Sequence, residues 1–245
     1  MIPATFVEIV GKDDSRYLNW QERSIAASKE RKASRSIDPI ASAYGQAMRE
    51  LEFATFSHLA KTCQVVSERI LITPNTGDPR WGMYQCEEID CVVYTSGSPK
   101  VLCEIKHSVS PVYSTMAARG QIAKRLEKAR ARWPELSGLL ICFYLSWLKP
   151  PPFEPFATMC QAELEARLVD PNLPQDNTRV FMVEAISLID RLVDCSLLAP
   201  DFRDRLTSLY RANNDPFGEI QTSNKNPASG LVSIGDLLKE STEEG

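Results

Sequence analysis

The sequence predicts an α/β fold in which a mixed central sheet is flanked by helices. Two observations predict this class: apolar residues recur at helical spacing in two stretches, and β-rich apolar runs lie between and after them. In chain order we expect a helix, three strands, a helix and a strand, over residues 38–63, 64–73, 84–94, 100–106, 115–133 and 139–145. Elements in this order pack as layers around one core.

Local signals mark where these elements begin and end. Asp38 and Pro39 supply an N-cap and a proline at the first helical position, which predicts the start of the first helix. The turn-forming residues 74–79 end the first strand, and residues 95–99 separate the next two strands as in a hairpin. The run LLICFYL at residues 139–145 is apolar on both faces, which is typical of a strand buried inside a sheet.

The remaining segments are expected to surround this core. Residues 1–37 are predicted to form an N-terminal strand and then an exposed basic linker, because residues 21–36 mix Arg and Lys with Ser and Ala. After the core we expect three helices and one strand, near residues 160–169, 186–198, 202–212 and 180–183. Residues 213–245 are predicted to be a flexible tail. The main domain would therefore span residues 38–212, with its core at residues 38–146.

The composition is typical of a globular protein. Of the 245 residues, 43% are hydrophobic and 24% are charged. No apolar run approaches the roughly 18 residues that a membrane helix needs, and the first residues do not resemble a signal peptide. We therefore expect a soluble, cytoplasmic protein with no membrane partner. Walker, Rossmann and Ser-x-x-Lys motifs are absent from the sequence, which leaves nucleotide-driven, dinucleotide-dependent and serine-acyl chemistry unsupported.

The cysteines and histidines argue against a zinc or disulfide protein. The seven cysteines are scattered, mostly within apolar segments and without a Cys-x-x-Cys pair, so they are predicted to be reduced core residues. The two histidines, His58 and His107, are too few for a histidine-based zinc site. The net charge of −4 leaves nucleic-acid binding open, because local basic patches create the field that a phosphate backbone meets.

Charged side chains interrupt two of the predicted strands. Asp90 lies within one apolar run, and Glu104 and Lys106 lie within the next. Because side chains alternate along a strand, Glu104 and Lys106 are expected to share one face. A buried charge needs a partner, a metal or water, since burying an isolated ion costs several kcal/mol. The alternative is a simple salt bridge on the polar face of an edge strand.

A third carboxylate is predicted to point toward this pair. On a helical wheel, Glu52 lies inside the apolar stripe of the first predicted helix, whereas Glu50 points toward solvent. Carboxylates gathered in this way suit a divalent cation, and Mg²⁺ prefers a few carboxylate oxygens plus water. Asp90, Glu104, the carbonyl of Ile105 and, through water, Glu52 are the predicted ligands. The alternative for Glu52 is a surface residue at the edge of the stripe.

These features resemble the PD-(D/E)xK nuclease superfamily. Asp90 is followed after thirteen residues by Glu104-Ile105-Lys106 on adjacent predicted strands, with an acidic helix before them and a helix and an apolar strand after them. The resemblance covers residues 40–146 and implies a restriction-endonuclease-like αβββαβ core with C-terminal helical additions. The chain departs from the pattern in having Ile89 where the name-giving proline stands.

The resemblance implies an Mg²⁺-dependent deoxyribonuclease, more specifically an endonuclease, with Mn²⁺ as a substitute metal. Asp90 and Glu104 would bind the metal, Glu52 would be the helix carboxylate, and Lys106 would position or activate the attacking water. The expected partner is DNA, in restriction, phage defence, repair or mobile-element processing, with RNA as an open alternative. The rival hypothesis is a noncatalytic nucleic-acid- or protein-binding module with a nuclease-like fold. A homodimer is left open.

The helix after the motif is a candidate nucleic-acid surface. Its polar flank gathers five residues within about 100° of the helical wheel, namely Gln121, Lys124, Arg125, Lys128 and Arg132. Beside a nuclease motif, such a flank suits contacts to the phosphate backbone. The alternative is an ordinary solvated helix face. The basic segment at residues 23–35 is expected to add nonspecific phosphate contacts, and His107 is expected to face away from Lys106 as a structural residue.

Overall fold

The computed structural model of the chain describes residues 6–32, 38–77, 82–149, 157–170, 173 and 179–214. Its centre is one six-stranded sheet whose strand order follows the sequence. The strands are β1 (Glu8–Gly11), β2 (Val66–Pro74), β3 (Tyr84–Thr95), β4 (Ser98–Ser108), β5 (Ser137–Tyr144) and β6 (Arg179–Glu184). The pairs β1–β2, β2–β3 and β3–β4 are antiparallel, whereas the pairs β4–β5 and β5–β6 are parallel. The predicted α/β class with a mixed sheet is therefore confirmed.

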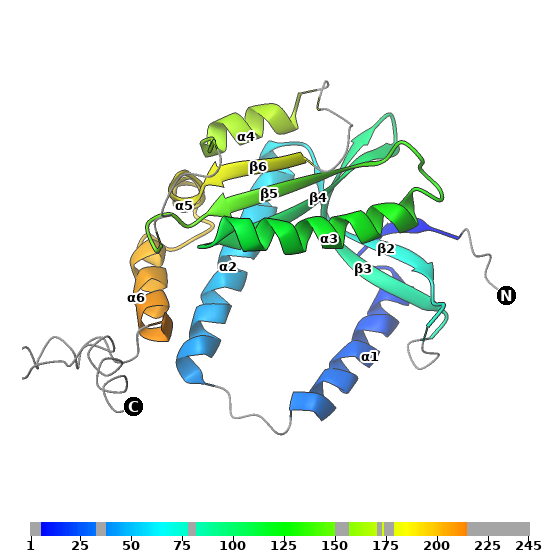
Figure 1. Cartoon of the computed structure of the whole chain (residues 1–245), viewed down its shortest axis with the longest axis horizontal. Coiled ribbons are helices and arrows are strands. Elements are labelled where there is room, and N and C mark those ends of the chain that lie inside the picture. The colour runs from blue at the N-terminus through cyan, green and yellow to red at the C-terminus, as the bar shows by residue number, and fades with distance from the viewer. Residues whose placement is uncertain are drawn as a thin grey trace, which may run out of the picture.

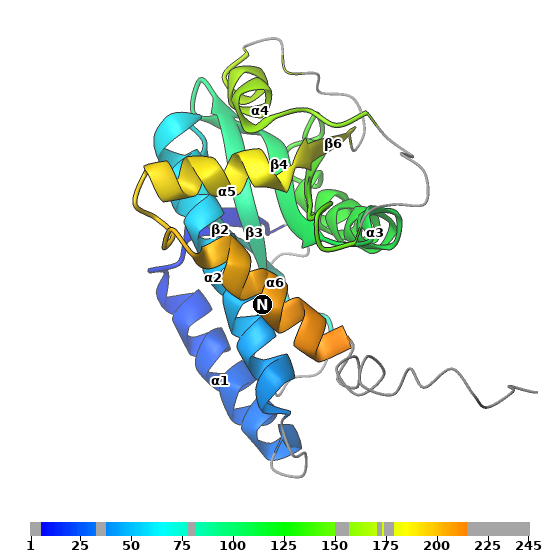
Figure 2. The same ribbon diagram turned by 90° about the vertical axis from the view of Figure 1, so that its left-hand side faces the viewer.

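Helices cover both faces of this sheet (Figure 1). They are α1 (Ser15–Lys32), α2 (Pro39–Thr62), α3 (Pro111–Ala129), α4 (Gln161–Leu168), α5 (Ala185–Asp194) and α6 (Phe202–Asn214). Helices α2, α4, α5 and α6 share one apolar core with the sheet, in which Leu51 packs with Ile105 and Phe143. Helix α3 builds a second core on the opposite face through Ile122 and Leu126. Figure 2 shows α2 and α3 on either side of the strands.

The helix boundaries follow from local capping chemistry. The Asp38 side chain accepts a hydrogen bond from the Ile40 N–H at 2.9 Å, and Pro39 opens α2, as predicted. Helix α3 begins at Pro111 rather than near residue 115; Pro111 takes the first helical position, and the Ser110 side chain before it makes no capping hydrogen bond. Strand β5 is buried along its whole length, which confirms the prediction made from its apolar run.

The basic segment that was predicted to be a linker is instead helical over its described part. Helix α1 spans Ser15–Lys32 and contains no glycine or proline to interrupt it. Asp14 accepts a hydrogen bond from the Arg16 N–H at 2.9 Å at the start of the helix. Tyr17 is 2% exposed and donates to Glu88 on β3 at 2.5 Å. A buried aromatic anchor thus stabilises a helix that composition alone did not predict. The tail predicted at residues 213–245 lies outside the described residues from residue 215 onward.

Two further findings bear on the composition-based predictions. All seven cysteines are free; five are buried as expected, but Cys160 and Cys195 are exposed because they lie at helix termini. No helix within the described ranges combines the length and the apolar character that crossing a membrane requires.

The sheet has a break at the strand that carries Asp90. Strand β3 pairs with β4 only from Cys91 onward, in the register Cys91↔Cys103, and beyond Cys103 the described partner of β4 is β5. On the other side, the β2–β3 register passes from Ser67↔Cys91 to Arg69↔Ile89 and omits the position between them. Strand β3 therefore parts from β4 at Asp90, within the sheet rather than at its rim.

Candidate active site

The break in the sheet brings the predicted motif residues to one place. Asp90 lies on β3 where that strand leaves β4, and Glu104 and Lys106 follow the last β3–β4 pair on β4. On β2, Glu68 has a φ of 53°, in the left-handed region that non-glycine residues rarely adopt. Irregularities of this kind re-aim side chains and occur often beside active sites. The local break thus turns the Asp90 carboxylate toward β4.

Asp90 is held by the backbone of the strand it faces. Its Oδ2 accepts a hydrogen bond from the Ile105 N–H at 2.6 Å. Burial raises the pKa of Asp90, and the negative charges of Glu104 and Glu52 raise it further, while the Ile105 N–H and Lys106 lower it. The result is a pKa of about 7, compared with 3.8 for a free aspartate. Burial and the acidic neighbours of Asp90 thus outweigh the Ile105 N–H and the positive charge of Lys106.

Glu104 is the most deeply buried carboxylate of the motif. Its side chain is 3% exposed, and its two oxygens have different partners. Lys106 Nζ lies 2.6 Å from Oε1, and Arg125 on α3 binds Oε2. The salt bridge considered from the sequence is thus present, but β4 lies between β3 and β5, so the edge-strand alternative is wrong. Charged side chains on an interior strand are not explained by the ordinary exposure of polar groups on an edge strand.

Glu52 joins this cluster from α2. Burial raises the pKa of Glu52; the positive charge of Lys106 lowers it, and the negative charge of Glu104 raises it. Glu52 is half-buried on α2, and the charges of Lys106 and Glu104 are near enough to affect its pKa. Helix α2 packs on one face of the sheet, whereas Arg125, the partner of Glu104, reaches the site from α3 on the other face. Glu50 by contrast lies at the surface, where it pairs with Arg205 of α6 at 2.5 Å. Glu52 is half-buried rather than fully exposed, and its role as a metal ligand stays a prediction.

The basic flank of α3 is divided between the site and the rest of the fold. Arg125 binds Glu104, whereas Lys128 binds Glu87 on β3 and lies 3.3 Å from the Gln85 side chain. These contacts were not predicted, because they depend on α3 packing over β4 and β5, from where its side chains reach Glu104 and Glu87. Two of the five residues predicted to bind nucleic acid therefore form ion pairs within the protein.

A third member of that flank also has a partner within the fold. Arg132 donates to the Val7 carbonyl at 2.8 Å, and its guanidinium lies 5.1 Å from the centre of the Trp133 ring. Gln121 and Lys124 are exposed on the helix surface. They are the two predicted residues that remain most accessible to a substrate.

His107 behaves as the structural residue that was predicted. Its ring stacks on Phe143, with centroids 5.2 Å apart, and its Nε2 lies 3.1 Å from Thr55 Oγ1. Burial lowers the pKa of His107 to about 3, and the nearby charge of Lys106 lowers it too, so the ring is neutral. It supports the α2 face of β4 and does not point to the carboxylates.

The carboxylate oxygens of the site suit a hard divalent cation, although the described residues do not form a complete set of metal ligands. Within the described residues, no three His, Cys, Asp or Glu side chains converge closely enough to hold a metal. Asp90, Glu104 and Glu52 nevertheless offer carboxylate oxygens, which Mg²⁺ prefers. Asp90 also has the raised pKa expected of a carboxylate that a cation would neutralise. Both oxygens of Glu104 are engaged by Lys106 and Arg125, so cation binding there requires an exchange of partners.

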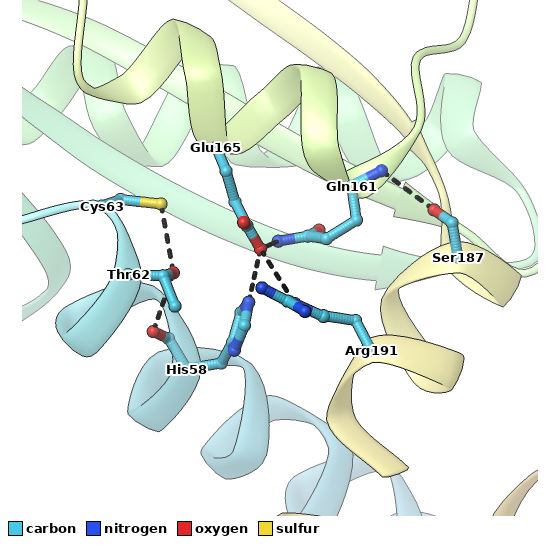
Figure 3. Close-up of polar contacts among 7 residues, drawn as sticks. All are labelled: His58, Thr62, Cys63, Gln161, Glu165, Ser187 and Arg191. Carbon is cyan, nitrogen blue, oxygen red and sulfur yellow. Dashed lines mark hydrogen bonds and ion pairs between the residues drawn. The ribbon is translucent and has the colours of Figure 1, made fainter. Parts of the chain in front are cut away.

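A second buried polar cluster, which was not predicted, lies among α2, α4 and α5 (Figure 3). The His58 side chain is 1% exposed, and its Nε2 lies 2.5 Å from Glu165 Oε1. Gln161 donates to the same oxygen at 3.1 Å, and Arg191 Nε lies 4.0 Å from it. No pattern in the sequence links these residues, since they come from three helices. Their contacts join α4 to the main core rather than to the Asp90 site.

A cavity of about 250 Å³ lies away from the motif, at the end of α2 and beside α4. Its lining includes Cys63, Lys100 and Leu168, but neither the carboxylates nor Lys106. The cavity therefore has no part in the chemistry considered for the motif.

No family model matches the chain, and no significant match is found among curated proteins or solved structures. The case for a function therefore depends on the residues and their geometry.

Proposed function

We propose that the protein is a metal-dependent nuclease that hydrolyses phosphodiester bonds of DNA on a restriction-endonuclease-like core. One observation carries the proposal: Asp90, Glu104 and Lys106 lie together where two neighbouring strands part, with Asp90 bound to the Ile105 N–H and Lys106 paired with Glu104. The order α2, β2, β3, β4, α3, β5 agrees with the αβββαβ core that the sequence resemblance implies. Two carboxylates and a lysine on interior strands of a sheet are costly unless they serve a function.

The residues divide into metal ligands and a water-positioning group. Asp90 and Glu104 would hold Mg²⁺ or Mn²⁺, with the Ile105 carbonyl and Glu52 as further predicted ligands. When bound, the cation would polarise the phosphate and lower the pKa of an attacking water. The Lys106 side chain is 33% exposed, so its ammonium can donate to solvent as well as to Glu104. In that position it can orient a water or contact a phosphate oxygen.

The test is cleavage of plasmid DNA by the full chain with Mg²⁺ or Mn²⁺, with EDTA as the control. We expect Asp90→Asn to abolish cleavage. Lys106→Ala should lower the rate by at least about 100-fold, the usual size of a lost proton-transfer or positioning group, with DNA affinity nearly unchanged. Lys61→Ala, which removes an exposed lysine on the same helix as Glu52, should keep full activity. Absence of metal-dependent cleavage of both DNA and RNA by the wild type would contradict the proposal.

One observation favours a second candidate, a noncatalytic module that binds nucleic acid or protein. Glu104 is already paired with Lys106 and Arg125, as in a purely structural ion cluster. Calorimetric titration with Mn²⁺ separates the two candidates. A nuclease site should bind Mn²⁺ and lose it in Asp90→Asn, whereas a structural cluster should not bind it. An RNA nuclease would use the same residues and is distinguished by the substrate that is cut.

A further inference from the structure

Lys106 and Arg125 divide the two oxygens of Glu104 between them. Lys106 lies two residues along the same strand, whereas Arg125 reaches the site from α3. The Glu104 side chain is 3% exposed and that of Arg125 is 18% exposed, so water screens this pair only weakly. The metal-free protein thus holds two positive charges against a carboxylate that the proposed reaction requires as a metal ligand.

Arg125 is the partner that can leave. A divalent cation at Glu104 would lie within a few ångströms of the guanidinium, and like charges repel strongly in a partly buried site. Lys106 is part of β4 and remains beside Glu104 wherever its ammonium points. Arg125 has a long side chain on a separate helix, and the only acidic residue of that helix, Glu127, lies about 160° away around the helix axis. Released from Glu104, Arg125 has no substitute partner on α3.

We propose that Arg125 exchanges partners: it binds Glu104 in the free protein and a backbone phosphate of the nucleic acid once a divalent cation holds Glu104. This inference rests on the proposed function and adds a mode of regulation to it. A guanidinium matches the geometry of a phosphate with two parallel hydrogen bonds. Gln121 lies one turn earlier on the same flank and is exposed, so a phosphate backbone that reaches Arg125 would pass beside it.

The exchange couples the binding of metal to the binding of nucleic acid, with positive cooperativity between the two ligands. Arg125 weakens metal binding in the free protein, because its contact with Glu104 must be broken. Once freed, the same side chain strengthens nucleic-acid binding. By linkage, each ligand then raises the affinity of the other by the same factor.

The first measurement is Mn²⁺ binding to the full chain by calorimetry. Arg125→Gln should bind Mn²⁺ about tenfold more tightly than the wild type, within the usual range of such couplings. Arg119→Gln removes an exposed arginine of the same helix and should leave the affinity unchanged. Equal or weaker binding by Arg125→Gln would overturn the inference. The proposed function fails separately, if the wild type neither binds Mn²⁺ nor cleaves nucleic acid.

The second measurement uses the wild type and does not depend on whether the variant folds. The side-chain Nε–H resonance of Arg125 in an NMR spectrum should shift as Mg²⁺ is added, and should shift again with a phosphorothioate DNA duplex that resists cleavage. A resonance that stays unchanged while Mg²⁺ saturates the protein would overturn the exchange. In a matching anisotropy assay, Mg²⁺ should increase the affinity for this duplex more in the wild type than in Arg125→Gln, and an equal increase would also contradict it.

Discussion

The position of the Asp90 carboxylate is set by the end of the β3–β4 pairing and by the Ile105 N–H. From the sequence Asp90 was an acidic interruption of an apolar strand, and strand geometry predicted that Glu104 and Lys106 on the next strand share one face. The break in the β2–β3–β4 pairing could not, because it depends on three strands that are distant in sequence. Ile89 and Val92 both pack against α3, although residues three apart on a regular strand point to opposite faces. The change of direction at Asp90 is what presents its carboxylate to Ile105.

The raised pKa of Asp90 predicts an unusual dependence of stability on pH in metal-free protein. Because the folded pKa is about 7 and the free value is 3.8, the folded state binds the extra proton between these values. Stability therefore falls as the pH rises through this window and is lowest above it. Asp90→Asn keeps an acceptor for the Ile105 N–H and removes the charge, so at pH 8 in EDTA it should be more stable by up to about 4 kcal/mol. Urea unfolding at pH 5 and pH 8 measures this effect; a variant less stable than wild type at pH 8 would contradict it.

Helix α3 shows how far an element can be interpreted from its sequence. Its apolar stripe through Ile122 and Leu126 and its basic flank were both predicted correctly as faces. What each basic residue does was not predictable, because the partners Glu104, Glu87 and Val7 come from other elements. A helical wheel gives directions around an axis, and only the packed structure shows what lies in those directions.

The members of this flank should therefore separate into binding and structural residues. Lys124→Ala should reduce the slope of DNA affinity against salt by about one unit, because one phosphate contact is lost, and should leave the melting temperature unchanged. Lys128→Ala and Arg132→Ala should each lower the free energy of unfolding by about 0.5–1 kcal/mol, since each loses a contact within the fold. Fluorescence anisotropy at several salt concentrations, together with thermal melts, tests both. An unchanged salt slope in Lys124→Ala would show that Lys124 makes no phosphate contact and is only part of a solvated face.

The packing of α4 against α2 should weaken at acid pH, because it depends on the contact between His58 and Glu165. Burial alone would raise the pKa of Glu165, but hydrogen bonds from His58 and Gln161 and the nearby charge of Arg191 outweigh it, and the pKa is lowered. This stabilisation is present above the ordinary glutamate pKa and is lost as the pH falls through the lowered value. Glu165→Gln should cost about 1 kcal/mol at pH 6, and the difference from wild type should shrink toward pH 3.5. A gap that stays constant over this range in urea unfolding would contradict the assignment.

In the whole molecule, β4 is the strand at which antiparallel pairing changes to parallel pairing. On one side of β4, strands β1 to β4 pair antiparallel, and on the other, strands β4 to β6 pair parallel. The order of these elements was predictable, since each has its own apolar period and its own turn or cap signals. The helical state of α1 was not, since its anchor is the single buried Tyr17 on Glu88. The site lies at the junction, because Asp90 belongs to one half and the Ile105 N–H that holds it belongs to β4.

A cation at this junction should stabilise the chain as a whole. It would bind Asp90 on β3 and Glu104 on β4, next to the point where their pairing ends, so unfolding either half would release it. At a free Mn²⁺ concentration of about 100 times Kd, the gain is about 2.7 kcal/mol, which corresponds to a rise of about 5–10 °C in Tm for a domain of this size. Differential scanning calorimetry should show this rise in the wild type and in Glu165→Gln, whose change lies in the separate cluster around His58, but not in Asp90→Asn. An equal rise in Asp90→Asn would mean that Mn²⁺ binds elsewhere, and the assignment of Asp90 as a metal ligand would have to be abandoned.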